Sequence, residues 1–203
     1  ILYVCGHAIN PYGAKYAYQH HGILNSRNGY VVFIVDPIQI SEIYAVHHGV
    51  YSFDRWDWFS RGYNPSGVEV WTAMRALDYL ETRPEVDPRL IGMTGRSGGG
   101  TMSWFTAALD ERVKVVVTAN ATSTVSTHVS ENLFQGHCDC AYFSNLYRFD
   151  WPTLAAMIAP RPLMLQNATR DPIYPPAGYK RVMKMAAGIY KMYGVPERLK
   201  EVE

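Results

Sequence analysis

The sequence has almost no net charge, few cysteines and no long apolar run. Its 203 residues carry 19 Lys and Arg against 18 Asp and Glu, a formal net charge of +1. This balance argues against nucleic acid or anionic lipid as a partner, because both attract strongly basic surfaces. Three cysteines are too few for a disulfide framework. No apolar run approaches the roughly 20 residues that a membrane-spanning helix needs. We therefore expect neither a nucleic-acid nor a membrane partner.

The residues that are abundant are those of a folded core. Hydrophobic residues make up 48% of the chain and charged residues 18%, which excludes a disordered protein. The chain is long enough for one domain with a sizeable core. It is also rich in aromatic residues, with 15 Tyr, 5 Trp and 7 Phe, which often accompany a site for rings or sugars.

Apolar, β-rich runs alternate along the chain with segments of helical periodicity. Strands are expected at 1–5, 30–36, 89–94, 113–118 and 161–166, and helices at about 66–80, 98–109, 152–158 and 176–193. Such alternation predicts an α/β protein with a doubly wound, mostly parallel sheet flanked by helices. We expect a single domain over residues 1–203, with excursions at about 38–65 and 121–150. Ser66 is also a candidate helix cap, with Glu69 three residues later as the second residue of a capping box.

Both ends of the sequence look strand-like. Residues 1–4 read as a strand without a preceding Met, and residues 198–203 begin to alternate like a strand and then stop. We expect a sheet that is trimmed at both ends, and bare edge strands would allow two copies to pair as a homo-oligomer. A lost leader would leave no trace, so the sequence does not predict a compartment.

The segment from Gly95 to Gly99 has the pattern G-x-S-x-G, between a predicted strand and a predicted helix. The two glycines allow a turn so tight that a Cβ would clash. This context favours a nucleophile elbow, with Ser97 as the catalytic nucleophile and the Gly98 amide as an oxyanion donor. The alternative is a phosphate-binding glycine turn, but the segment lacks the lysine of a P-loop.

The candidate catalytic acid is Asp171, which lies just past the predicted strand at 161–166. A carboxylate after a later strand fits the chain order Ser, acid, His. Asp before Pro is also a common turn residue, and Asp139 and Asp150 are weaker rivals for the role.

The catalytic base has no obvious candidate, because no histidine follows His137. One explanation is that the base lies in a segment missing from the given sequence. Another is that His128 or His137 supplies it from elsewhere in the fold. A third is that the protein is inactive, because without a base Ser97 keeps an ordinary hydroxyl.

Other residue clusters give weaker signals. His137, Cys138, Asp139 and Cys140 lie together, but zinc sites need four well-spaced ligands, so a structured loop is favoured and no metal or cofactor is expected. The aromatic run at 51–63, with Trp58 in it, is a candidate surface for stacking sugar or aryl groups, and the alternative is packing within a loop lid. Arg96 is a candidate partner for an anionic substrate group, or for a carboxylate under the elbow.

Several segments together resemble the acetyl xylan esterase-like branch of the α/β-hydrolases, with dienelactone hydrolases and the prolyl-oligopeptidase catalytic domain as more distant relatives. The segments that carry the resemblance are 3–8, 36–39, 95–100, 136–140, 159–163 and 171–175. The resemblance implies a cofactor-free serine carboxylesterase with Ser97 as nucleophile and Asp171 as acid. It also implies that an amide near His7 completes the oxyanion hole. The family's C-terminal histidine has no counterpart here.

The expected function is therefore hydrolysis of carboxylic esters through an acyl-enzyme, with acylated carbohydrate or a small ester as substrate. One rival is a peptidase or amidase of the same fold, although this class usually carries a gating domain for which the chain has no room. The other rival is a non-catalytic scaffold that binds a ligand or partner.

Overall fold

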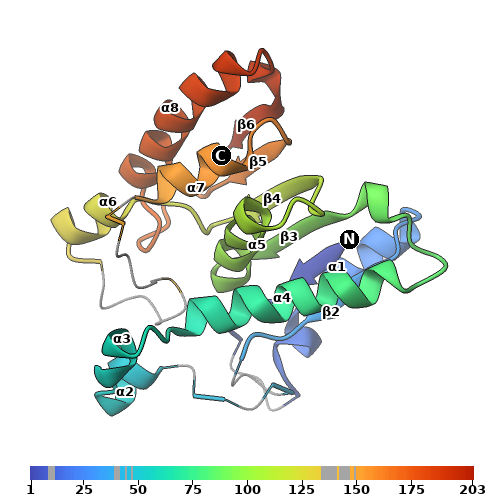
Figure 1. Ribbon diagram of the computed structural model, residues 1–203, viewed down its shortest axis with the longest axis horizontal. Coiled ribbons are helices and arrows are strands. Elements are labelled where there is room, and N and C mark those ends of the chain that lie inside the picture. The colour runs from blue at the N-terminus through green and yellow to red at the C-terminus, as the bar shows by residue number, and fades with distance from the viewer. Residues whose placement is uncertain are drawn as a thin grey trace.

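Six parallel strands form one sheet through the middle of the molecule (Figure 1). The computed structural model describes residues 1–8, 12–38, 42–43, 45–46, 48–133, 141, 147–148 and 150–203. The strands are β1 (Leu2–Val4), β2 (Phe33–Val35), β3 (Gly92–Arg96), β4 (Val115–Ala119), β5 (Leu163–Gln166) and β6 (Leu199–Val202). Their order across the sheet is β2-β1-β3-β4-β5-β6, and every neighbouring pair is parallel. The predicted fold class is confirmed.

Eight α-helices among the described residues connect the strands. They are α1 (Ala14–Arg27), α2 (Gly49–Phe53), α3 (Asp57–Ser60), α4 (Pro65–Glu81), α5 (Gly98–Leu109), α6 (Val125–Ser130), α7 (Trp151–Ile158) and α8 (Pro176–Met192), with short 3₁₀ turns at Pro88–Leu90 and Pro196–Arg198. None of the helices in the described part of the chain combines the length and the apolar character needed to cross a lipid bilayer.

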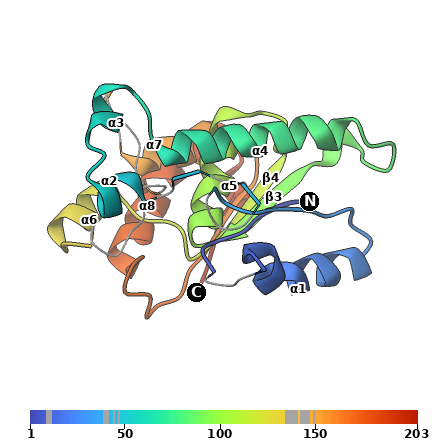
Figure 2. The same ribbon diagram turned by 90° about the horizontal axis from the view of Figure 1, so that it is seen from below.

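The two faces of the sheet carry different layers, because side chains alternate along each strand. Leu2, Val4, Val116 and Leu163 point into the main core, which α4, α5, α7 and α8 cover. Tyr3 and Cys5 point to the other face, where they form a smaller core with Ala14 and Tyr18 of α1. Figure 2 shows α4 and α1 on opposite sides of the strands.

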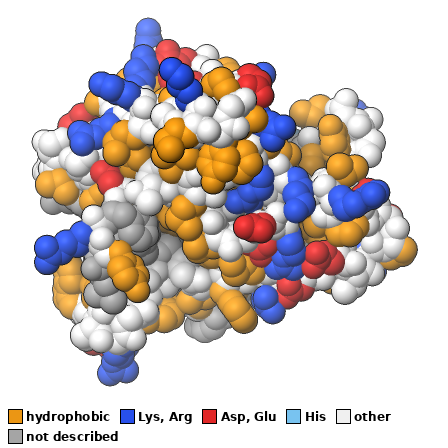
Figure 3. Space-filling model, turned by 45° about the horizontal axis from the view of Figure 1, so that its top comes forward, with side chains coloured by type: hydrophobic (Ala, Val, Ile, Leu, Met, Phe, Trp, Pro, Cys, Tyr) orange, Lys and Arg blue, Asp and Glu red, His pale blue; other side chains and the backbone are white. Residues whose placement is uncertain are grey.

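Over the surface shown in Figure 3, acidic and basic side chains lie side by side.

One helix is missing from the sequence prediction, and the predicted start of another needs correction. Helix α1 was not predicted, because its buried stripe consists only of Ala14, Tyr18 and Gly22 and gives a weak periodic signal. Helix α4 begins at Pro65 rather than after Ser66. Its cap is Asn64, whose side-chain oxygen accepts the Gly67 N–H at 2.8 Å. Proline suits the first helical position because its missing N–H has no partner there in any case.

Parallel strands place all their carboxyl ends at one edge of the sheet, where open α/β sheets bind ligands. Ser97 follows β3, the segment from Cys5 to His7 follows β1, and the loop with Asp171 follows β5. The excursion with α2 and α3 joins the end of β2 to the start of α4, so it lies at the same edge (Figure 1).

Candidate active site

Ser97 occupies a sharp turn between β3 and α5. Its backbone has φ 56° and ψ −127°, a positive-φ conformation that a residue with a Cβ seldom adopts. Such a conformation costs of the order of 1–3 kcal/mol and persists only where surrounding contacts hold it. Here the Ser97 N–H donates to the Ala119 carbonyl at 2.8 Å, and its carbonyl accepts the Thr101 N–H at 2.9 Å. This is the strained strand-to-helix turn that a nucleophile elbow requires.

The glycines of the motif are needed because backbone from β1 lies against the turn. A Cβ on Gly99 would stand 2.1 Å from the Val4 carbonyl oxygen, and one on Gly95 would stand 2.5 Å from the same atom. Real Cβ atoms essentially never approach another atom closer than 3.0 Å. The G-x-S-x-G pattern is therefore explained by the close approach of three backbone segments.

The first turn of α5 presents N–H groups beside Ser97. The first four N–H groups of a helix have no partner within the helix, and the helix dipole adds partial positive charge there. Gly98 is the first residue of α5, and Ser97 provides no side-chain cap. The Gly98 amide is thus suitably placed for an oxyanion that forms next to the Ser97 hydroxyl.

The turn after β1 lies directly beside the elbow. A Cβ on Gly6 would stand 2.3 Å from the Arg96 carbonyl oxygen, so the two backbones touch just before Ser97. His7 follows, half-buried, with its ring centroid 6.0 Å from that of His48. The structure therefore places the turn that contains Gly6 against the backbone that leads into Ser97, and an oxyanion donor near His7 stays a prediction.

Asp171 lies in the loop after β5 and has defined partners. Its Oδ1 accepts the N–H groups of Ile173 at 2.8 Å and Tyr174 at 3.1 Å, which fixes the carboxylate in a tight turn. The side chain is half-buried, so one part of it still faces outward.

Tyr174 links this loop to the elbow helix. Its hydroxyl lies 3.2 Å from the Thr101 hydroxyl, and the Thr101 hydroxyl lies 3.3 Å from the Ser97 carbonyl oxygen. Burial raises the pKa of Tyr174 to about 12, so the phenol stays neutral. Sequence reasoning missed both residues, and the available signal was the position of Thr101 one turn after Ser97.

The rival residues have other surroundings. His128 is fully buried in α6, edge-on to Trp151 at 5.2 Å between ring centroids. Asp150 caps α7 through Trp151 N–H at 2.7 Å and accepts the Val125 N–H at 2.7 Å, so it joins two helix starts. His137 and Asp139 lie outside the described residues.

Within the described part of the chain, His, Cys, Asp and Glu side chains form no group of three or more that could hold a metal ion. The sequence cluster at 137–140 lies outside that part.

Arg96 lies on the face of the sheet that carries α1. Gly95 faces α5, so the next residue of the strand points to the opposite side. There Arg96 lines a surface cavity of about 480 Å³ together with Tyr3, His21 and Gln166. The structure thus directs this side chain toward α1 rather than toward the helix that begins at the elbow.

Trp58 is buried within the excursion instead of facing outward. Its side chain is only 7% exposed, and a Cβ on Gly49 would fall 1.9 Å from the indole. Tyr63 packs edge-on against it at 4.7 Å. Of the two alternatives for Trp58, stacking of substrate or packing within the loop, this burial favours packing. Among the described side chains of this segment, Phe53, Trp56 and Phe59 are exposed aromatic residues.

Comparisons with known proteins agree with this geometry. The family described as BAAT / Acyl-CoA thioester hydrolase C terminal matches residues 74–147, which include the elbow. The Bacillus subtilis (strain 168) protein "Putative hydrolase YtaP" is 29% identical over 184 residues, covering 81% of this chain and 60% of that protein. The 4-O-methyl-glucuronoyl methylesterase 1 of Wolfiporia cocos is 27% identical over 152 residues, covering 63% of this chain and 37% of that protein.

A solved structure extends the likeness to the whole chain. The solved structure of a carbohydrate esterase family 15 glucuronoyl esterase from Caldicellulosiruptor kristjansonii has a TM-score of 0.66 at 18% identity, covering all of this chain and 62% of that one. The chain therefore spans about 60% or less of the length of each of these proteins. With its parallel sheet, its strained elbow at Ser97 and these likenesses, the chain has the α/β-hydrolase fold and is similar in sequence to a putative hydrolase and to a glucuronoyl methylesterase.

Proposed function

We propose that the protein is a serine carboxylic-ester hydrolase that removes acyl or alkyl groups from ester-substituted carbohydrate. The observation that carries the proposal is the strained backbone of Ser97 at the start of α5, with the turn after β1 against it. Backbone strain of this kind is found mainly at functional sites, where it contributes to the mechanism. The sequence likeness to a methylesterase whose name refers to a glucuronoyl group supports carbohydrate as the substrate class.

In the proposed reaction, the Ser97 hydroxyl oxygen attacks the ester carbonyl carbon. The carbonyl oxygen becomes an oxyanion held by the Gly98 N–H and an N–H near His7. Collapse of this intermediate expels the alcohol and leaves an acyl-enzyme, which water then hydrolyses. Asp171 has the role of orienting the histidine base that takes the Ser97 proton. The 203 residues contain no histidine after His137.

Hydrolysis of thioesters is a second candidate, favoured by the family match over residues 74–147. The same nucleophile and oxyanion donors serve both reactions, because Ser97 attacks an acyl carbon in each of them. The two differ in the leaving group, so parallel assays with an acetylated sugar and an acetyl thioester distinguish them.

The test of the proposal is turnover of p-nitrophenyl acetate by the protein and by Ser97→Ala. Loss of the nucleophile is expected to lower the rate about a thousandfold. The matched control is Ser130→Ala, an exposed serine on α6, which should keep the full rate. A wild-type rate equal to that of Ser97→Ala would contradict the proposal for this chain and favour the non-catalytic scaffold.

A further inference from the structure

Three exposed aromatic side chains belong to the excursion that precedes α4. Phe53 is 61% exposed, Trp56 63% and Phe59 43%. They lie within seven consecutive residues, at the end of α2, before α3 and within α3. We call these three residues the aromatic platform. Exposed apolar clusters of this kind mark binding surfaces more often than scattered single residues do.

The platform is held in place from beneath. Trp58 is buried between Gly49 and Tyr63, which anchors α3 against α2. Backbone hydrogen bonds fix the chain between the helices, with Arg55 N–H donating to Gly49 carbonyl at 3.1 Å and Trp56 N–H to Asp54 carbonyl at 2.8 Å. The rings of Trp56 and Phe59 lie 6.3 Å apart between centroids. Rings on a fixed support bind with little loss of conformational entropy.

Charged side chains accompany the rings. Asp57 forms ion pairs with Arg55 at 3.0 Å and with Arg61 at 3.2 Å. These groups supply both donors and acceptors for hydroxyl groups. Their charges oppose insertion into lipid, because an ion pair loses its hydration there.

The size and chemistry of the platform fit sugar rings. A pyranose presents C–H groups with partial positive charge, which pack against the negative face of an aromatic ring. A protein partner needs about 800 Å² from some 20–30 residues on each side, far more than three rings provide. Because α2 and α3 lie at the same sheet edge as Ser97, a chain bound here can extend toward the nucleophile.

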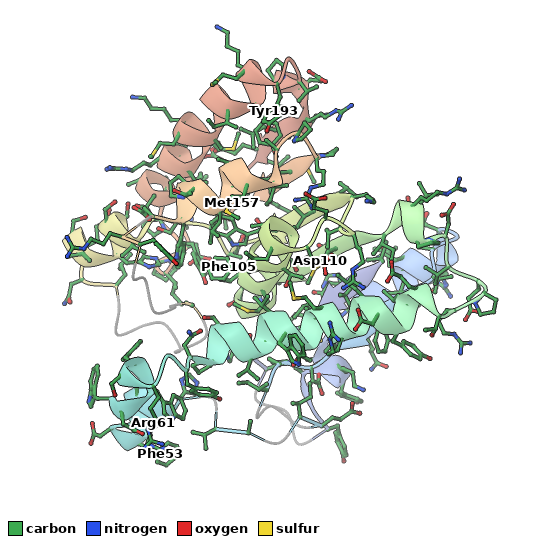
Figure 4. All side chains as sticks on the ribbon, in the orientation of Figure 1. Phe53, Arg61, Phe105, Asp110, Met157 and Tyr193 are labelled. Atoms are coloured by element: carbon green, nitrogen blue, oxygen red, sulfur yellow. The ribbon has the colours of Figure 1, made fainter. Side chains whose placement is uncertain are left out.

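From this arrangement we propose that Phe53, Trp56 and Phe59 bind pyranose rings of a polysaccharide and hold the polymer beside the active site. The choice of a polymer rests on the proposed function, which names ester-substituted carbohydrate as substrate. In Figure 4, Phe53 and Arg61 lie together at the excursion, and Tyr193 lies at the far end of α8.

The test is electrophoresis of the native protein through gels with and without soluble, partly acetylated xylan. The wild type should be retarded by the xylan, and Trp56→Ala should bind about tenfold more weakly. Tyr193→Ala is the matched control, because Tyr193 is an aromatic residue of similar exposure, 59%, after the C-terminus of α8. This control should be retarded like the wild type, and the thermal midpoint of each variant verifies that it is folded.

Three results would overturn the proposal that the aromatic platform binds polysaccharide. The first is a wild type that migrates alike in both gels, and the second is a Trp56→Ala variant retarded as strongly as the wild type. The third is a dimer, seen by light scattering, that Trp56→Ala converts to monomer, because the rings would then bind a second copy. Binding is measured without ester turnover, so retardation in a protein that hydrolyses no ester would refute the proposed function alone.

Discussion

Replacement of Gly99 by alanine tests the close packing beneath the elbow. The new Cβ would stand 2.1 Å from the Val4 carbonyl oxygen and 2.6 Å from the Cys5 carbonyl carbon. Since 3.0 Å is the practical lower limit, the end of β1 must retreat by about 0.9 Å relative to α5. Both neighbours are backbone atoms, so no side chain can rotate away to make room.

The expected cost combines two effects. Overpacking in a filled interior typically costs 1–3 kcal/mol, and a displaced strand weakens hydrogen bonds worth about 1 kcal/mol each. Alanine in a helix gains less than about 1 kcal/mol over glycine. We therefore expect Gly99→Ala to lower the free energy of unfolding by about 2–3 kcal/mol.

Gly188→Ala is the matched control. Gly188 lies in α8, and a Cβ there would meet no atom within 4 Å, so this variant should gain about 0.5–1 kcal/mol. Urea unfolding followed by circular dichroism measures the free energy of unfolding of both variants. Unchanged m-values would show that each substitution changes stability alone. A Gly99→Ala protein as stable as the wild type would refute the packing argument. Displacement of the turn after β1 should also lower esterase turnover about tenfold or more.

Two further predictions concern stability. Asp150→Ala should lower the free energy of unfolding by about 1–2 kcal/mol, because Asp150 accepts N–H groups at the starts of both α6 and α7. Asp150→Asn should lose much less, because its side-chain oxygen still accepts both groups, and equal urea midpoints for Asp150→Ala and the wild type would contradict this. Burial, His20 and Arg96 lower the pKa of His21, so the folded state resists its protonation and stability falls as the pH drops below about 6.5. His21→Gln should reduce this loss between pH 7.5 and pH 5, as measured by urea midpoints, and an undiminished loss would exclude His21 as its source.

The fold class could be predicted because it depends on patterns within short segments. The predicted strands at 89–94, 113–118 and 161–166 overlap β3, β4 and β5, although each observed strand begins two or three residues later. Helix α8 starts at Pro176 as expected. Boundaries were less predictable, because caps such as Asn64 and turns such as Pro88–Leu90 depend on single residues.

Side-chain direction at the site was harder to predict. Arg96 adjoins Ser97 in sequence, yet strand alternation places it on the α1 face with Tyr3 and His21. For Trp58 the sequence left stacking of substrate and packing within the loop as alternatives, and its contact with Gly49 favours packing. In both cases, the place of the residue in its strand or helix sets the direction of its side chain. Nearness in sequence to a functional segment does not.

Local sequence specifies the elbow, because Gly95, Ser97 and Gly99 encode a tight turn through steric rules. It also determined that strands and helices alternate. Tertiary packing sets the position of β1 between β2 and β3, which brings the turn with Gly6 against the elbow. It likewise brings Tyr174 to Thr101 across 73 positions of sequence. Such contacts depend on the packing of distant segments, and no pattern within a short stretch of sequence specifies them.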